Sequence, residues 1–169
     1  MKTSRLIIET GNRYGCLRVT GQRPGDVLKL TERQIVDGVL LIPAQNKTGR
    51  PLRIRVEGEF GLLVQRILDR KETYKVWCAN LAVNTRGLPM TKQVLRTGFK
   101  DAKDAAIKAA PELKDAIKAF WFYDLRAKAA DDVADERGDQ AAADQLGHGS
   151  VAVTQRHYLR RGKTVGPTR

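Results

Sequence analysis

Only one long stretch of this 169-residue sequence, residues 38–56, is patterned like a β-hairpin. A short apolar run at 39–42 is followed at 52–56 by apolar residues that alternate with arginines, and turn-forming and basic residues at 45–50 separate the two. Alternation on both sides of a polar turn is typical of paired strands. The pattern predicts a hairpin with a basic tip, and residues 76–78 could add one short strand.

The remainder of the chain is patterned as a series of helices. Apolar residues at helical spacing predict helices over 4–19, 23–30 and 60–70. From Thr91 onward the chain is rich in alanine, and capping residues, glycines and prolines divide it into further helices. Those helices are expected over 92–110 (capped by Thr91), 111–118, 125–137 (capped by Asp124 and ended by Gly138), 139–145 (ended by Gly147), and from Ser150 towards Tyr158.

Length and composition favour a single soluble domain. A chain of 169 residues with 41% hydrophobic residues can bury one sizeable core. No apolar run approaches the length of about 18 residues that a membrane helix needs, and the first 20 residues lack the apolar centre of a secretion signal. Two cysteines are too few for a disulfide scaffold. These features predict a reduced, cytoplasmic protein.

Positive charge is concentrated in one part of the sequence. The formal net charge is +12, and residues 1–100 contain 19 basic and 8 acidic residues, a balance of +11. Such an excess attracts phosphate-rich partners through counterion release and long-range fields. The charge therefore favours nucleic acid over an anionic membrane, although a basic protein without a polyanion partner would show the same composition.

Motifs for a metal ion or a nucleotide cofactor are missing from the sequence. It contains no phosphate-binding loop, no dinucleotide fingerprint and no pair of cysteines at metal-binding spacing. The two histidines, His148 and His157, are nine residues apart, whereas a pair on one helix face needs three or four. We expect neither a metal nor a cofactor.

Five polar residues are candidates for chemistry because they lie at expected junctions between loops and helices: Arg23, Lys47, Arg126, His148 and Tyr158. Each has an ordinary structural explanation when taken alone. A single arginine of a basic protein is usually solvated, a lysine at a hairpin tip protects the strand edge, and a tyrosine usually packs. Only their order and spacing together favour a shared function.

That order resembles the tyrosine recombinase, or phage integrase, family. Residues 20–30, Thr-Gly-Gln-Arg-Pro-Gly-Asp-Val-Leu-Lys-Leu, resemble its first catalytic box, and Lys47 follows on a hairpin tip. Residues 123–126, Tyr-Asp-Leu-Arg, are similar to its His-x-x-Arg box, and residues 146–150 match its Leu-Gly-His box. Tyr158 then stands where the family has its nucleophile. The resemblance covers nearly the whole chain and corresponds to the C-terminal catalytic domain.

The resemblance implies a fold and a domain organisation. The expected fold is α+β and mainly α-helical, with a small antiparallel three-stranded β-sheet that carries Lys47. Residues 1–169 are expected to form a single catalytic domain, without the N-terminal DNA-binding domains of a full-length integrase.

The resemblance also implies roles for the candidate residues. Arg23 and Arg126 would hold the scissile phosphate with planar guanidinium groups that stay charged, and His148 would donate a further hydrogen bond. Tyr158 would be the nucleophile and form a 3′-phosphotyrosyl bond. Lys47 would protonate the leaving 5′-oxygen as general acid.

Tyr123 departs from the family pattern, which usually has histidine at this position. A phenol has an ordinary pKa near 10 and is a poor base at neutral pH. We therefore expect Tyr123 to orient the phosphate or the nucleophile. Among the other aromatic residues, we expect Phe120, Trp121, Phe122 and Trp77 to pack in the protein interior, and His157 to face solvent or DNA.

The implied function is site-specific DNA cleavage and rejoining, for integration or excision of a phage genome or another mobile element. Alternatives are a chromosome-dimer resolvase, a type IB topoisomerase-like enzyme, and a basic DNA-binding module with a vestigial active site. The expected partners are double-stranded DNA with attachment-type sites and possible accessory DNA-bending proteins. We expect a homo-tetramer on DNA, a monomer for the isolated domain, and a location in the bacterial cytoplasm near the nucleoid.

Overall fold

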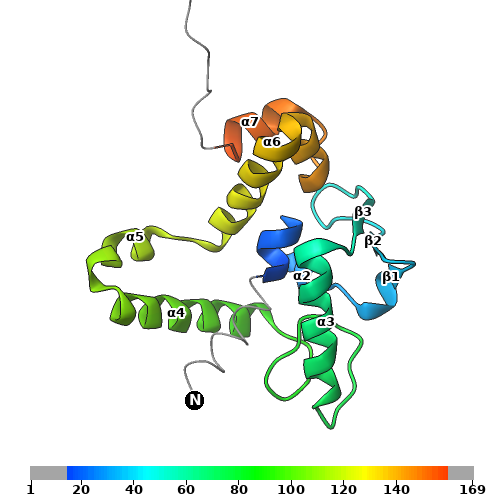
Figure 1. The fold of residues 1–169 in the computed structure, drawn as a ribbon, viewed down its shortest axis with the longest axis vertical. Coiled ribbons are helices and arrows are strands. Elements are labelled where there is room, and N and C mark those ends of the chain that lie inside the picture. The colour runs from blue at the N-terminus through cyan, green and yellow to red at the C-terminus, as the bar shows by residue number, and fades with distance from the viewer. Residues whose placement is uncertain (1–14, 160–169) are drawn as a thin grey trace, which may run out of the picture.

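The fold was obtained as a computed structural model that describes residues 15–159. It is mainly helical with one small sheet, as expected (Figure 1). A helix at residues 15–20 precedes α2 (Pro24–Val27), and one turn of 3-10 helix (Glu32–Gln34) leads into β1 (Ile35–Val36), β2 (Val39–Ile42) and β3 (Leu52–Arg55). The helices that follow are α3 (Gly58–Glu72), α4 (Lys92–Ala109), α5 (Lys114–Ala119, after a 3-10 turn at Pro111–Leu113), α6 (Phe122–Leu146) and α7 (Val151–His157).

The sheet has three antiparallel strands in the order β1-β2-β3, and its main hairpin is the predicted one. Its third strand is not at residues 76–78, which form no strand; that prediction was wrong. The third strand is β1, joined to β2 by the two-residue turn Asp37-Gly38, whose φ angles are 49° and 71°. Asp-Gly with two positive φ angles is a turn whose twist matches that of paired strands.

The main core lies where α3, the sheet and the N-terminal helices meet. Leu17, Leu40, Leu63 and Ile67 are almost fully buried there, together with Leu81 from the segment after α3. Burying several large aliphatic side chains stabilises this region by about 1.5–3 kcal/mol for each. The core therefore fixes the first half of the chain and the base of the β2–β3 hairpin.

The second half of the chain follows the predicted helix boundaries closely. The Thr91 side chain caps α4, and the Ser150 side chain caps α7. Gly138 breaks α6 with a φ of 86°, and Gly147 ends it with a φ of 65°. One boundary differs: α6 begins at Phe122, and the Asp124 carboxylate accepts the Trp121 N–H from within the first turn.

Figure 1 shows how these helices are arranged. α4 and α5 extend to one side of the molecule, α6 returns from them, and α7 packs beside the far end of α6. The loop between β2 and β3 meets the junction of α6 and α7 through hydrogen bonds to residues 146 and 148. Segments far apart in the sequence thus converge at this junction.

The aromatic residues expected in the interior are mostly at the surface. The exposed fractions of Trp77 and Trp121 are 66% and 67%, and Phe120 is also exposed. Trp77 lies under Arg33, and Phe122 is half-buried and stacks on Phe99 at 4.1 Å between ring centroids. The expectation of a buried cluster therefore holds in part for Phe122 and fails for the other three.

Two expectations concern residues outside 15–159. The part of the predicted first helix at 4–14 and the basic tail at 160–169 lie outside the described residues. Within the described range, no helix is both long enough and apolar enough to cross a membrane.

Candidate functional site

Five of the six candidate residues line one open pocket of about 630 Å³: Arg23, Lys47, Tyr123, His148 and Tyr158. They come from the start of α2, the β2–β3 loop, the start of α6, the α6–α7 junction and the end of α7. The sixth, Arg126, lies beneath this pocket, with its guanidinium carbon 5.2 Å from the Tyr158 ring centroid. The fold thus gathers all six residues in one region.

Arg23 lies where the helix of residues 15–20 has ended and α2 begins. The chain turns at Gly21, whose φ is 65°, and Pro24 starts α2 immediately after Arg23. The Arg23 Nη1 atom is buried and has no hydrogen-bond partner. A buried cationic nitrogen without a partner is costly, and a phosphate oxygen in the pocket would satisfy it.

Arg126 is almost fully buried, with 1% of its surface exposed, and it connects two parts of the chain. Its Nη1 donates to the Gly21 carbonyl, and its Nη2 donates to the Leu146 carbonyl at 2.8 Å. Its Nε has no partner. Burial lowers the pKa of Arg126, as does the charge of Arg23, while the interaction with Tyr158 opposes the shift. Arg126 therefore supports the site structurally and keeps one N–H unpaired.

His148 is buried between Arg126 and Thr154. Its Nε2 lies 3.2 Å from Arg126 Nη2, and its Nδ1 lies 2.7 Å from Thr154 Oγ1. Because a guanidinium can only donate, Nε2 must accept, and the proton therefore resides on Nδ1. Burial lowers the pKa of His148 to about 4, and the charges of Arg126, Arg23, His157 and Lys47 add to this effect. His148 is therefore neutral at pH 7.

Tyr158 is half-buried at the end of α7, where its N–H donates to the Thr154 carbonyl at 2.9 Å. Its ring lies 4.8 Å from the His148 ring between centroids. Lys47 is exposed at the tip of the β2–β3 hairpin and lines the same pocket. The phenol and the ammonium group thus reach one pocket from different elements, one from a helix end and the other from a loop.

A buried polar network beneath the site was not anticipated from the sequence. Gln45 donates to the side chain of Gln22 at 2.6 Å and to the Leu146 carbonyl at 3.3 Å. Gln22 donates in turn to the Gln145 carbonyl at 2.9 Å. Gln22 directly precedes Arg23, and Gln45 lies two residues before Lys47. This proximity is the only sequence signal that could have indicated the two glutamines.

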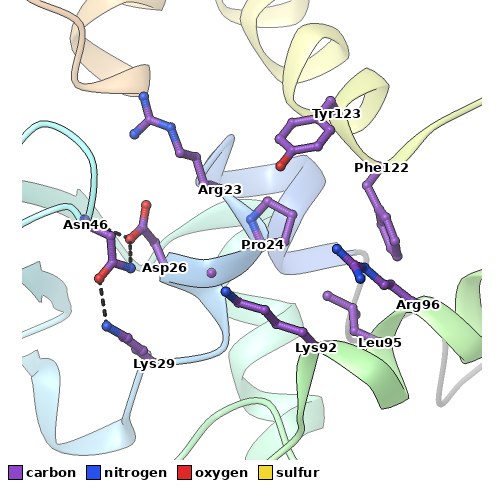
Figure 2. A pocket seen from close by; sticks show the side chains of 11 residues that line it. Arg23, Pro24, Asp26, Lys29, Asn46, Lys92, Leu95, Arg96, Phe122 and Tyr123 are labelled. Carbon is purple, nitrogen blue, oxygen red and sulfur yellow. Dashed lines mark hydrogen bonds between the residues drawn. The ribbon is translucent and has the colours of Figure 1, made fainter.

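Asp26 is a second residue that sequence reasoning missed. It is buried one turn after Arg23, and its Oδ1 accepts the backbone N–H of Asn46 at 3.0 Å and also the Asn46 side-chain amide. Lys29 donates to Asn46 from the other side at 2.7 Å. This set of bonds, drawn in Figure 2, ties the start of α2 to the loop that carries Lys47.

A second pocket of about 490 Å³ adjoins the first and shares Arg23 and Tyr123 with it. Lys29, Lys92 and Arg96 add three cationic side chains to its lining. In Figure 2 the Tyr123 hydroxyl points toward the start of α2. Tyr123 is 61% exposed, so its hydroxyl is accessible to a ligand in either pocket. The two pockets together form a basic surface suited to several phosphates.

Within residues 15–159, no group of three or more His, Cys, Asp or Glu side chains is arranged to hold a metal ion.

Comparison with protein families gives one match that spans most of the chain. The model of the phage integrase family matches residues 5–164. A search of the curated proteins found no match.

Solved structures with the same fold come from integrases and a recombinase. A lambda integrase in a dimer bound to a COC′ core site has a TM-score of 0.70 and 20% identity, over 97% of this chain and 49% of that one. The lambda integrase catalytic core has a TM-score of 0.64 and 20% identity, over 85% of this chain and 90% of that one. XerA recombinase has a TM-score of 0.68 and 20% identity, over 95% of this chain and 59% of that one. The chain thus spans about half the length of the integrase in the DNA complex and most of the catalytic core.

Proposed function

Because this chain belongs to the phage integrase family of tyrosine recombinases, we propose that it cleaves and rejoins DNA strands through a 3′-phosphotyrosyl intermediate. The observation that carries the proposal is the shared pocket. Five candidate residues from distant segments line it, and Arg23 Nη1 and Arg126 Nε are unpartnered buried nitrogens beside it. A phosphodiester offers the negatively charged oxygens that guanidinium groups bind.

In the proposed reaction, the Tyr158 oxygen attacks the scissile phosphorus while the bond from phosphorus to the 5′-oxygen breaks. The phenol releases its proton to a water molecule in the open pocket, and Lys47 gives a proton to the departing 5′-oxygen. Negative charge that develops on the two non-bridging oxygens is stabilised by Arg23 and Arg126. Preorganised donors of this kind are worth about 3–4 kcal/mol each.

His148 takes part through its contact with Arg126. In the free protein its Nε2 is occupied by the Arg126 N–H. A phosphate that binds Arg126 supplies negative charge next to the imidazole, which favours its protonated form and allows Nε2 to donate. Tyr123, the residue that replaces the usual histidine, is assigned an orienting role on the phosphate.

Rejoining is the reverse of cleavage. A 5′-hydroxyl attacks the phosphotyrosine and gives its proton to Lys47, while the phosphorus–tyrosine bond breaks and the Tyr158 oxygen regains a proton from the solvent. The phosphotyrosyl bond retains the energy of the original linkage, so the proposed cycle uses no nucleotide cofactor.

The biological setting completes the proposal. We place residues 1–169 as a catalytic domain that integrates or excises a phage genome or other mobile element in the bacterial cytoplasm, as a homo-tetramer on attachment-type DNA. The lambda integrase structures include a tetramer bound to a Holliday junction, which supports this assembly. A resolvase or topoisomerase-like activity would use the same pocket, and a vestigial site would not cleave.

A covalent trapping assay tests the proposal. The protein is incubated with nicked suicide DNA, in which the cleaved strand loses its short 5′-hydroxyl end, and adducts are resolved on a denaturing gel. The parent chain is expected to form a covalent adduct, and Tyr158→Phe is expected to form none, because the variant lacks only the attacking oxygen.

DNA affinity is the control in this assay. Tyr158→Phe keeps the ring packed against His148, so its binding to uncleaved duplex should match that of the parent. An adduct formed by Tyr158→Phe at the parental rate would remove Tyr158 from the proposed role. A parent that binds DNA and never forms an adduct would favour the vestigial alternative.

A further inference from the structure

The tip of the β2–β3 hairpin is attached to the α6–α7 junction at both of its ends. We propose that Gln45 and Arg50 are positioning residues that dock this tip and thereby place Lys47 for proton transfer to the leaving oxygen. The inference rests on the proposed function. It assigns to the side chains of Gln45 and Arg50 an effect on one step of that reaction, the protonation of the leaving oxygen.

Gln45 attaches the first end of the tip. Its side chain is 1% exposed and donates to the Leu146 carbonyl and to the Gln22 side chain. It approaches Gly147 so closely that a Cβ there would lie 2.2 Å from its Oε1. A buried amide with this many partners has one favourable orientation. The residue two positions before Lys47 is therefore fixed against the end of α6.

Arg50 attaches the second end of the tip. Its Nη1 donates to the His148 carbonyl at 3.1 Å, and a Cβ at Gly149 would lie 2.8 Å from its Nη2. The guanidinium thus covers the backbone of the loop that carries His148. Unlike Gln45, Arg50 is exposed, so the hydrogen bond to the His148 carbonyl is the main structural contribution of its side chain.

The tip between these two anchors is closed by short-range bonds. Gln45 N–H donates to the Arg50 carbonyl at 2.9 Å, and Gly49 N–H donates to the Gln45 carbonyl at 2.8 Å. The Thr48 hydroxyl donates to Gln45 Oε1 at 2.7 Å. Lys47 is consequently an exposed residue of a compact turn whose ends are both held on the α6–α7 junction, and it lines the pocket.

A rival role for Gln45 arises from the Leu146 carbonyl. That oxygen accepts from Arg126 as well as from Gln45. Loss of Gln45 could therefore act on the phosphate-binding arginine rather than on Lys47. Within residues 15–159, Arg50 and Arg126 donate to different carbonyl groups, which makes the Arg50 variant the cleaner test.

The chemistry of the leaving group distinguishes an effect on Lys47 from an effect on the phosphate-binding Arg126. A substrate with sulfur in place of the bridging 5′-oxygen departs as a thiolate and needs no general acid. A defect that acts through Lys47 is therefore rescued by sulfur, whereas a defect in charge stabilisation persists. Lys47→Ala and Arg126→Ala provide the two reference behaviours.

The experiment measures the rate of adduct formation at saturating DNA for Arg50→Met and Gln45→Met, with the oxygen and the sulfur suicide substrates. With oxygen, we expect Arg50→Met and Gln45→Met to be slower than the parent by about ten- to a hundredfold, since a general acid moved by about 1 Å loses much of its effect. With sulfur, both should react within about threefold of the parent, as Lys47→Ala should.

Arg53→Met is the matched control. Arg53 is an exposed arginine of β3 in the same hairpin, so its replacement removes the same charge without touching the α6–α7 junction. It should react like the parent on both substrates. Thermal melting by circular dichroism accompanies each variant, and Arg50→Met, which alters an exposed residue, should melt near the parental temperature.

Three results would overturn the inference and leave the proposed function standing. Arg50→Met at the parental rate with oxygen would show that the contact positions nothing. Equal losses with oxygen and sulfur would show that Arg50 acts through phosphate or DNA binding. A loss of rate in Arg53→Met equal to that in Arg50→Met would show that the removed positive charge alone explains the effect. A parent inactive on both substrates would refute the proposed function itself, and this inference with it.

Discussion

At the scale of single residues, Arg126 combines a structural and a proposed chemical role. It holds the Gly21 and Leu146 carbonyls and contacts His148, and its buried Nε has no hydrogen-bond partner. Arg126→Lys keeps the charge but replaces a planar fork with one ammonium group, which cannot reach two carbonyls and a phosphate together. We expect the adduct-forming rate to fall about a hundredfold or more, and the melting temperature to fall as well.

Arg156→Lys is the control for this substitution, because Arg156 is an exposed arginine of α7 close to Tyr158 in sequence. It should leave both the rate and the melting temperature near the parental values. If Arg126→Lys forms adduct within a few-fold of the parent, the Arg126 guanidinium does not contact the scissile phosphate.

His148 makes stability depend on pH in a defined window. Its folded pKa of about 4 lies below its ordinary value of 6.5, because burial and nearby cations disfavour the charged ring. As the pH falls from about 6.5 to 4, the unfolded chain takes up a proton that the folded chain does not, so the free energy of unfolding decreases. The free energy of unfolding can be measured by urea denaturation at pH 7 and pH 5. Its decrease between these two pH values should be smaller in His148→Gln than in the parent.

The parental chain supplies the comparison for that experiment. Identical pH dependence in the parent and in His148→Gln would show that the buried imidazole is not the group responsible.

The order and spacing of the residues, compared with the family pattern, were enough to nominate the six candidate positions. They could not reveal which of those residues are buried or what they contact. Arg126 was expected only as a phosphate ligand, yet most of its donors serve the protein itself. Gln45 was unremarkable in the sequence because its partners, Gln22 and Leu146, are distant along the chain.

At the scale of secondary-structure elements, the end of α6 depends on Gly147. This residue has a φ of 65° and lies against the Gln45 side chain. Gly147→Ala adds a left-handed backbone penalty of about 1–2 kcal/mol, and the new methyl group must also displace Gln45. We expect a lower free energy of unfolding, measured by urea denaturation, and slower adduct formation on the oxygen substrate.

Gly38→Ala separates these two contributions. Gly38 has a similar φ of 71°, but a Cβ there would meet nothing within 4 Å. Its variant should therefore lose only the backbone part of the free energy, and Gly147→Ala should lose more. Equal losses in the two variants would show that the contact with Gln45 contributes nothing measurable.

Helix boundaries were predictable because caps and glycines act locally, as Thr91, Gly138 and Ser150 show. Short strands were harder, because two residues carry almost no periodic signal. The strand β1 could have been found from the Asp37-Gly38 turn that precedes β2. The apolar and aromatic residues at 76–78 resembled a strand, but that segment pairs with no other strand.

At the scale of the whole molecule, charge and local structure act together. The net charge of +12 draws the chain toward polyanions in general, whereas the two adjoining pockets gather cationic side chains at particular positions. Composition alone predicted the attraction to polyanions. The positions of the two pockets required the fold, because α2, the β2–β3 loop, α6 and α7 contribute to their linings from across the sequence.

The same charge bears on self-association. Each copy carries +12, so two copies repel each other unless DNA neutralises them. After Tyr158 the sequence has only two apolar anchors, Leu159 and Val165, of which Val165 lies outside the described residues. Burying both completely against a neighbour would contribute at most about 3–6 kcal/mol, and association itself costs about 4–15 kcal/mol.

We therefore expect the isolated 169-residue chain to be a monomer without DNA. Light scattering at micromolar concentration in moderate salt should give the mass of one chain. Raising the salt concentration screens the repulsion, so a chain that remains monomeric at both low and high salt lacks a strong interface of its own. A stable dimer or tetramer under either condition would contradict this expectation and would require an apolar interface elsewhere, for which the exposed Trp121 and Phe120 at the start of α6 are the first positions to mutate.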